Sequence, residues 1–563
     1  MNIQEILSKQ INIEGVEREE ISALISVDPG GGGVADAALP CFKFAKLLRK
    51  SPQQVAQELA ANFKKGSLLE SADAVNGYLN FKFNSAAFSR EILEEVLQNS
   101  KFGSSPLGKG KTICLDYSSV NIAKTFHIGH LGTTAIGNAL VNLFSFLGYK
   151  TVGINHLGDW GTQFGKLIVA FKKWGNKADI EKRGVDALQE IYIKFHEEEV
   201  KNPSLTDEAR EWFAKIERGN AEALQLFEWF KHITMIEVDK IYSRLGVKFD
   251  YFQGESFYND KMDEVLELAR KQGIVKNSDG AQIVDLEAYG MPPCLLVKAD
   301  GATLYATRDL AAALYRKRAY KFDKCLYVVA YQQNLHFKQF FKVLELMEFD
   351  WAKDMEHIAY GMVSLEEGPM STRKGNYVKL SDLLDKAEEK ALSVIEQKNP
   401  DLKDKKDTAS KIGVGAVIFS ALQNARIKDN VFSFDKVLNF EGETCPYLQY
   451  TVARANSVLE KGGQSSAVAP DFSVLDNGEA KEVAKCLNRF PQFVEDAAGA
   501  REPSILSKYL INLAQAYNKF YFEHKILCGD EAKQQPRLML TKAAAQVLTQ
   551  GLALLGIACP EKM

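Results

Sequence analysis

The stretch from residue 112 to residue 131, TICLDYSSVNIAKTFHIGHL, limits the possible folds of this chain more than any other. It opens with an apolar, β-prone run, Thr112 to Tyr117, which predicts a buried strand. Apolar residues at three- and four-residue steps from Leu131 to Leu147 predict a helix directly afterwards. The polar residues between them therefore lie on a strand-to-helix connection. In open α/β sheets, ligands bind at the carboxyl ends of such strands.

Two histidines, His127 and His130, stand on this connection on either side of Gly129. Imidazole N–H groups can donate to phosphate oxygens, and the amino terminus of the following helix favours anions. Gly129 would let a flat ring approach the backbone closely. The pattern therefore favours a nucleotide-binding turn, and the alternative is that both histidines are surface residues of an ordinary turn.

Length and composition restrict the class of protein. A chain of 563 residues is too long for one core, so three or four domains are expected. The net charge of −3 gives no global basic field, so an RNA partner would need a local patch. The eight cysteines form no CxxC pair and have no histidine at zinc spacing, which predicts reduced thiols and no structural metal. With no signal peptide and no membrane-length apolar run, the expected location is the cytoplasm, away from membranes.

Further polar residues follow other predicted strands of the same sheet. Tyr149 to Asn155 and Lys324 to Ala330 read as parallel strands, the second followed by Gln333. The string from Gly301 to Asp309 predicts a turn, a short strand and a helix start, with Asp309 in the first helical turn. Because strand ends of a parallel sheet share one edge, Asn121, Asp309 and Gln333 are expected there together.

HIGH in this setting resembles the ATP-binding signature of the class I aminoacyl-tRNA synthetases. The longer strings SSVNIAKTFHIGHLGTTAIGNAL and INHLGDWGTQFG resemble the arginyl-tRNA synthetase versions of that region. NGYLNFKF resembles part of the amino-terminal domain of that family, and GETCPYLQYTVARANSV resembles the start of its helical anticodon-binding domain. The resemblance covers essentially the whole chain, in the family's order.

The resemblance implies an α/β fold. A Rossmann-like catalytic domain with a parallel sheet is expected between an N-terminal α+β domain and an all-α C-terminal anticodon-binding domain. The expected boundaries are 1–108 for the tRNA D-loop-binding domain, 109–385 for the catalytic domain with a helical insertion around 170–250, 386–440 for a helical stem, and 441–563 for the anticodon-binding domain.

The resemblance also assigns the ATP site. His127, Gly129 and His130 would bind the phosphates. The loop MSTRKG resembles the second class I signature, KMSKS, whose cations steady the leaving pyrophosphate. Pro369 and Thr372 stand where the two lysines of that signature belong, and Lys124 is expected to substitute. The residues implied at the loop are Met370 and Ser371 for ATP binding and Arg373 and Lys374 for catalysis. Mg²⁺ would arrive with ATP as part of the substrate.

Arginine needs a different set of partners. A planar guanidinium requires a carboxylate in fork geometry, further acceptors and an apolar face. The family pattern, carried onto ESFY, YATRD and Gln333 to Phe337, implies Asp309 and Glu255 as carboxylates and Tyr305 as the platform. The polar head of the amino acid would be bound by Ser119, Asn121 and Gln333. The alternatives are that Asp309 only caps a helix and that Glu255 is a surface acid.

Candidate tRNA contacts lie at both ends of the chain. On the resemblance, Tyr78 and Asn80 would stack on and hydrogen-bond an unpaired base of the D-loop corner. Arg454 and the tyrosines at 517 and 521 are candidates in the C-terminal domain. The alternatives are a half-exposed strand for the first pair and packing between helices for the tyrosines.

The resemblance therefore implies an arginine–tRNA ligase that uses ATP, L-arginine and tRNA(Arg), and a monomer is expected because it suits the family. The family further implies that adenylation waits for bound tRNA. Two other functions fit part of the pattern. A smaller HIGH-bearing nucleotidyltransferase would lack the helical tail and YATRD, and a synthetase-like RNA-binding protein should have lost HIGH or MSTRKG.

Overall fold

The computed structural model describes residues 2–27, 35–64, 66–299, 301, 303, 305–365, 378–463 and 468–563. Their internal contacts divide them into two units. Unit 1 comprises Met1–Phe102, Arg454–Pro491 and Asn512–Leu548. Unit 2 comprises Gly103–Ala453, Gln492–Ile511 and Thr549–Met563.

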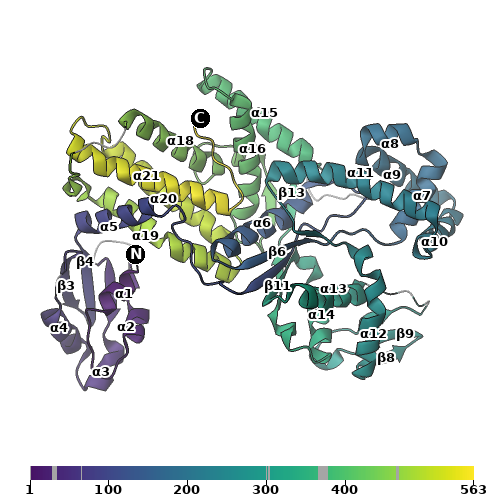
Figure 1. Cartoon of the computed structure of the whole chain (residues 1–563), viewed down its shortest axis with the longest axis horizontal. Helices are drawn as coiled ribbons and strands as arrows, with labels where there is room; N and C mark the ends of the chain where they lie inside the picture. The colour runs from purple at the N-terminus through teal and green to yellow at the C-terminus, as the bar shows by residue number, and fades with distance from the viewer. Residues whose placement is uncertain are drawn as a thin grey trace. The chain divides into compact units, whose positions relative to one another are not determined.

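The N-terminal part of unit 1 is an antiparallel sheet with the strand order β1-β2-β4-β3 (Figure 1). Alternation along β4 buries Leu79, Phe81 and Phe83 and leaves Tyr78 exposed. The strands are β1 (Ser26–Val27), β2 (Ala37–Pro40), β3 (Leu69–Val75) and β4 (Tyr78–Phe83). The helices are α1 (Ile3–Ser8), α2 (Arg18–Leu24), α3 (Phe42–Leu48), α4 (Pro52–Asn62) and α5 (Ser85–Gln98). This is the predicted α+β arrangement.

A buried ion cluster joins this sheet to the helical part of unit 1. The Asp36 carboxylate, just before β2, accepts Lys481 Nζ at 2.7 Å, Lys485 Nζ at 2.9 Å and the backbone N–H of Phe83 at 2.8 Å. All three side chains are largely shielded from solvent, so the Asp36 carboxylate stabilises two shielded cations at once.

We therefore expect Asp36→Asn to lower the free energy of unfolding by about 3 kcal/mol, because it removes the buried carboxylate that pairs with two shielded cations. Urea unfolding followed by circular dichroism measures the change. The control is Lys50→Met, which breaks the exposed Lys50–Glu58 pair and should cost less than about 1 kcal/mol. Equal losses for the two variants would contradict the interpretation.

Unit 2 is built on a five-stranded parallel sheet with the order β12-β11-β5-β6-β7. Its strands are β5 (Thr112–Asp116), β6 (Lys150–Asn155), β7 (Tyr251–Phe252), β11 (Lys324–Ala330) and β12 (Met355–Tyr360). The chain starts in the middle, adds strands on one side, and then returns to the other side of β5. The connections after β5 and β11 therefore diverge, and a ligand crevice is expected at the carboxyl ends of these strands.

Helices cover both faces of this sheet (Figure 1). One face packs on α13 (Tyr305–Tyr320) and α14 (Asn334–Leu346), where Cys114, Ile154 and Cys325 join an apolar core. On the other, α6 (Leu131–Phe146) lies so close that a Cβ atom on Gly137 would fall 2.3 Å from the ring of Tyr117. The close approach fixes the position of α6 and therefore of the HIGH turn that precedes it.

Between β6 and β7 the chain forms a group of helices (Figure 1). They are α7 (Thr162–Trp174), α8 (Lys177–Arg183), α9 (Val185–Lys201), α10 (Ser204–Glu217) and α11 (Ala221–Leu245). After the 3-10 turn η2 (Glu255–Lys261) and α12 (Met262–Lys271), a small antiparallel sheet precedes α13. Its strands are β8 (Val275–Ser278), β9 (Ala281–Val284) and β10 (Cys294–Val297).

The segment expected to be a helical stem contains α15 (Leu380–Lys398), α16 (Lys405–Leu422) and α17 (Phe434–Val437). The helical prediction is wrong at β14 (Asn430–Phe432), which pairs in parallel with β13 (Val363–Leu365). A strand this short has too few residues to show alternation, and its partner lies far away in sequence.

The C-terminal part is all-α, as predicted, and its helices contribute to both units. They are α18 (Cys445–Gly462), α19 (Gly478–Ala500), α20 (Ser504–Glu523) and α21 (Glu531–Leu554). Within the described parts of the chain, no helix has both the length and the apolarity needed to cross a membrane. All eight cysteines are free thiols.

Candidate active site

The loop after β5 has a strained backbone. Ser118, Ser119 and Ala123 have φ angles of 70°, 46° and 62°, in the left-handed region that non-glycine residues rarely adopt. Neighbouring helices hold the loop there, since Thr133 Oγ1 on α6 accepts the N–H of Ser118 at 2.9 Å and Thr234 Oγ1 on α11 accepts that of Ala123 at 3.0 Å. Strain that is fixed by surrounding contacts is typical of functional sites.

The geometry of the HIGH turn determines which nitrogen of each histidine carries the proton. The N–H of Gly129 donates to His127 Nδ1 at 3.1 Å, and the N–H of His127 donates to His130 Nδ1 at 3.2 Å. A nitrogen that accepts a hydrogen bond carries no proton, so both rings are Nε2–H tautomers. The ring centroids lie 4.0 Å apart, so the two imidazoles are direct neighbours.

Both imidazoles are uncharged near neutral pH. Burial, assisted by the charge of Lys124, lowers the pKa of His127 to about 4. Burial, with contributions from His127 and Lys124, lowers the pKa of His130 to about 3. The turn therefore combines two neutral N–H donors with a nearby lysine cation. This set suits phosphate oxygens, and Lys124 lies near enough to both histidines for its charge to lower their pKa values.

The residues that follow the MSTRKG loop are joined to this turn. The N–H of Ile128 donates to Val378 O at 3.1 Å, and the N–H of Leu380 donates to Phe126 O at 2.9 Å. The backbone after the second signature is thereby fixed against the first. The residues predicted for the loop itself, Met370, Ser371, Arg373 and Lys374, lie outside the described residues.

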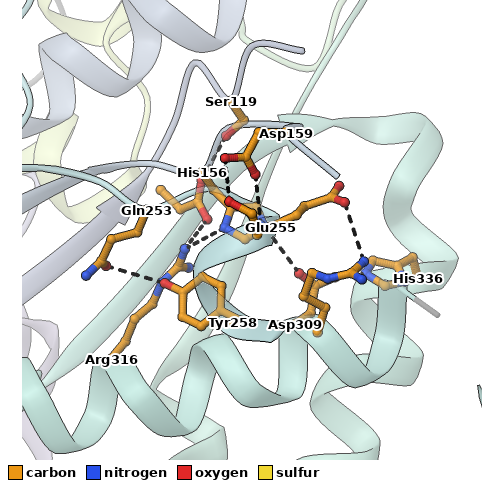
Figure 2. Close-up of polar contacts among 12 residues, drawn as sticks. Ser119, His156, Asp159, Gln253, Glu255, Tyr258, Asp309, Arg316 and His336 are labelled. Atoms are coloured by element: carbon orange, nitrogen blue, oxygen red, sulfur yellow. Dashed lines mark hydrogen bonds and ion pairs between the residues drawn. The ribbon is translucent and has the colours of Figure 1, made fainter. Parts of the chain in front are cut away.

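Asp309 lies inside α13, one turn further than predicted, because the helix already begins at Tyr305. The helix-cap alternative is therefore wrong. Its Oδ2 is 2.6 Å from His336 Nε2 on α14, and its Oδ1 is 3.9 Å from His156 Nε2 after β6 (Figure 2). Although burial works against ionisation, His336 and the other nearby bases hold the pKa of Asp309 below its usual value, and Asp309 in turn raises the pKa of His336.

Glu255 begins the 3-10 turn η2 after β7, and only 15% of its side chain is exposed, so the surface-acid alternative is wrong. Its Oε2 is 3.4 Å from Arg308 Nη1 on α13. Burial raises the pKa of Glu255 to about 7; Arg308 opposes this shift, and the charges of Asp309 and Asp159 add to it. The carboxyl group of Glu255 therefore lies where negative charge is already concentrated.

Several residues of the site were missed from the sequence. Arg316 Nη2 binds Asp116 Oδ2 at 2.8 Å in a buried pair and lies 3.4 Å from His156 Nδ1. Asp116 also accepts the hydroxyl of Ser119 at 2.9 Å. Polar contacts therefore run from Ser119 through Asp116, Arg316 and His156 to Asp309 (Figure 2). The only signal in the sequence was the position of Asp116 and His156 at strand ends.

The remaining arginine-site residues surround this chain of contacts. Asn121 pairs with Gly158, where a Cβ atom would lie 2.2 Å from Asn121 Oδ1. Tyr305 is 66% exposed at the start of α13, and Glu255 adds to burial in raising its pKa. Gln333 is exposed at the end of the 3-10 turn η4 (Tyr331–Gln333) after β11. In the described part of the chain, no three acidic, histidine or cysteine side chains are grouped as metal ligands.

The candidate tRNA residues all belong to unit 1. Tyr78 and Asn80 lie on β4, and the half-exposed Tyr78 ring meets Phe42 edge-on at 5.2 Å. The Arg454 guanidinium lies 5.1 Å from the Tyr521 ring, and its Nη1 donates to Asn518 at 3.3 Å. Tyr517 is buried, so packing is the correct interpretation of that residue.

Family models match almost the entire chain. Residues 92–434 match the catalytic domain of class I tRNA synthetases (R), and residues 448–563 match the DALR anticodon binding domain. Residues 1–83 match the arginyl tRNA synthetase N terminal domain.

Individual proteins give the same result. The chain is 50% identical to the arginine–tRNA ligase of Alkaliphilus metalliredigens, over 100% of this chain and 99% of that protein. It is 48% identical to the arginine–tRNA ligase of Halothermothrix orenii, with 99% and 98% covered. Among solved structures, the arginyl-tRNA synthetase of Thermus thermophilus superposes with a TM-score of 0.81 at 27% identity, over 96% of each chain.

Proposed function

The chain belongs to the arginyl-tRNA synthetases of class I, and we propose that it attaches L-arginine to tRNA(Arg) at the expense of ATP. The observation that carries this proposal is the meeting of two different sites at one sheet edge. A turn of neutral histidine donors follows β5, and the buried carboxylates of Glu255 and Asp309 lie beyond β7 and on α13. The first suits phosphates, and the second suits a guanidinium.

In the first step, the carboxylate of arginine attacks the α-phosphorus of ATP in line, and pyrophosphate leaves. Nε2–H of His127 and His130 would donate to the phosphate oxygens, with Gly129 leaving room for the nucleotide. Lys124, Arg373 and Lys374 would neutralise the charge that develops, and Met370 and Ser371 would contact ATP. Mg²⁺ would enter with ATP. The protein supplies positioning and charge stabilisation, and no covalent enzyme intermediate is needed.

The side chain of arginine would extend away from ATP, on the other side of its own attacking carboxylate. Asp309 and Glu255 would bind its guanidinium, with Tyr305 as a platform for its side chain. Ser119, Asn121 and Gln333 would hold its α-amino and carboxylate groups. The contacts from Ser119 to Asp309 support this assignment because they join the two ends of such a ligand through Asp116, Arg316 and His156.

In the second step, the 2′-hydroxyl of the terminal adenosine of the tRNA takes the arginyl group, and AMP is released. Residues 1–108 would bind the D-loop through Tyr78 and Asn80, and residues 441–563 would bind the anticodon stem-loop with Arg454. Residues 109–385 would carry catalysis and residues 386–440 the stem. We further propose that the enzyme is a monomer and works in the cytoplasm, where charged tRNA is used.

Arginine-dependent ATP–pyrophosphate exchange, with and without tRNA(Arg), tests the function. We expect exchange that depends on both arginine and the tRNA. If no exchange occurs when both are present, the proposed function is wrong. Exchange driven by another acid would indicate a cofactor-forming nucleotidyltransferase, and tRNA binding without exchange would indicate an RNA-binding protein.

The pH dependence of arginine binding gives a further prediction. Only ionised Glu255 attracts the guanidinium, and the pKa of Glu255 is about 7. The KM for arginine should therefore fall about tenfold as the pH rises from 6 to 8. Steady-state exchange at saturating ATP measures it. Glu255→Gln should raise the KM and remove most of this dependence; a wild-type KM that is flat across this range would contradict the role of Glu255.

A further inference from the structure

Asp159 lies on the loop after β6, and its side chain is fully buried. Its Oδ1 accepts the backbone N–H of Ser256 at 2.8 Å. Its Oδ2 accepts the Ser256 hydroxyl at 2.7 Å and Lys231 Nζ at 2.7 Å. Figure 2 shows this carboxylate next to Glu255. With three donors, including one cation, the buried charge is compensated and held in one orientation.

These contacts fix the backbone on both sides of Glu255. Ser256, the next residue, donates its N–H to Asp159. Gly254, the residue before, packs so closely against the same carboxylate that a Cβ atom on it would lie 2.4 Å from Asp159 Oδ1. The N–H of Glu255 itself donates to Leu157 O at 2.9 Å. Three consecutive residues are therefore held by the loop after β6, and the direction of the Glu255 side chain depends on them.

Lys231 comes from α11, in the helical group between β6 and β7. We propose that Asp159 and Lys231 are positioning residues that direct the Glu255 carboxylate toward the guanidinium of arginine. This inference rests on the proposed arginine-binding role of Glu255 and deepens it, because it makes the helical group between β6 and β7 part of amino-acid recognition.

The pKa of Glu255 can distinguish a positioning role of Asp159 and Lys231 from a role in packing alone. The charged and titratable groups that face Glu255 are Arg308, Asp309 and Tyr305 on α13 and Asp159 on the loop after β6, with Lys231 behind Asp159. The charge of Asp159 raises the pKa of Glu255. Removing that charge should lower this pKa, and removing the Lys231 cation, which compensates Asp159, should raise it.

The experiment measures pyrophosphate exchange with tRNA(Arg) present, as a function of arginine, ATP and pH. Asp159→Asn keeps the shape of the side chain, and we expect a KM for arginine about tenfold higher with a KM for ATP within about twofold of wild type. The midpoint of the pH dependence of the arginine KM should move to lower pH in Asp159→Asn. In Lys231→Met it should move to higher pH.

Opposite movements of the midpoint are not expected from a loss of packing. Ser256→Ala removes one hydroxyl only and keeps the test informative if Asp159→Asn does not fold; its arginine KM should rise about threefold. The matched control is Lys166→Met, which breaks the Lys166–Glu199 pair at 2.7 Å between α7 and α9 and should leave both KM values unchanged.

Two outcomes would overturn the inference: equal changes in the KM values for arginine and ATP, or an unchanged midpoint in both Asp159→Asn and Lys231→Met. Its failure is distinguishable from failure of the proposed function. If only the inference fails, wild-type exchange and the effect of Glu255→Gln persist, and the Asp159 variant lacks a selective rise in the arginine KM. If the proposed function fails, the wild-type enzyme itself shows no arginine-dependent exchange.

Discussion

Asp309→Asn should raise the KM for arginine about 100-fold, equivalent to about 2.7 kcal/mol, and change the KM for ATP less than about twofold. The substitution preserves the volume of the side chain and removes the negative charge that pairs with a guanidinium. It also leaves His336 facing an amide, where the carboxylate now accepts at 2.6 Å. Because both effects fall on the amino-acid side of the site, arginine binding should weaken and ATP binding should not. Exchange kinetics with each substrate varied in turn measure the two constants.

The matched control is Asp250→Asn. Asp250 is also a hydrogen-bonded carboxylate of unit 2, but its Oδ2 accepts the N–H of Gly153 on β6 at 2.7 Å. This variant should leave the KM for arginine near the wild-type value. If Asp309→Asn changes both KM values equally, Asp309 does not belong to the arginine pocket. His336→Gln should give a smaller rise in the arginine KM, because the carboxylate remains and only its orientation is relaxed.

His130→Asn should slow adenylate formation about 100- to 1000-fold while changing the KM for arginine little. An asparagine places its side-chain oxygen where His130 Nδ1 stands, so it can still accept the N–H of His127, which now donates at 3.2 Å. What it loses is the Nε2–H donor at the far end of the ring. The turn should therefore keep its shape and lose its contact with the phosphate. Single-turnover formation of arginyl-adenylate measures the rate.

His357→Asn is the control, since His357 is a half-buried histidine of the same sheet whose Nε2 lies 2.9 Å from Val329 O. It should leave the rate unchanged. The wild-type rate should also show no inflection near pH 6.5 from the HIGH histidines, because their pKa values are lowered to about 4 and about 3. An unchanged rate in His130→Asn would reject the phosphate role.

Local patterns predicted much of the catalytic fold. The apolar run that became β5 and the helical period that became α6 are written in consecutive residues, and HIGH lies between them as expected. The resemblance to the arginyl-tRNA synthetases extended this prediction to the order of the three parts of the chain. It also implied Glu255 and Asp309 as the carboxylates for arginine. The short strand β14 was missed because its pairing partner β13 is separated from it in sequence by the helices α15 and α16. It is also too short to show the alternation of a strand.

The sequence by itself determined the class of the fold, the family and the types of side chain at the site, because these follow from short-range periodicity and recognisable strings. Only the tertiary structure decided the state of those side chains. Burial of the HIGH turn made both histidines neutral Nε2–H donors, and His336 from α14 gave Asp309 its partner. The contact of Asp159 with Lys231 and Ser256 joins three distant segments and fixes Glu255 between them. Protonation, partner and orientation depend on neighbours that are brought together by folding, and no local pattern in the chain records them.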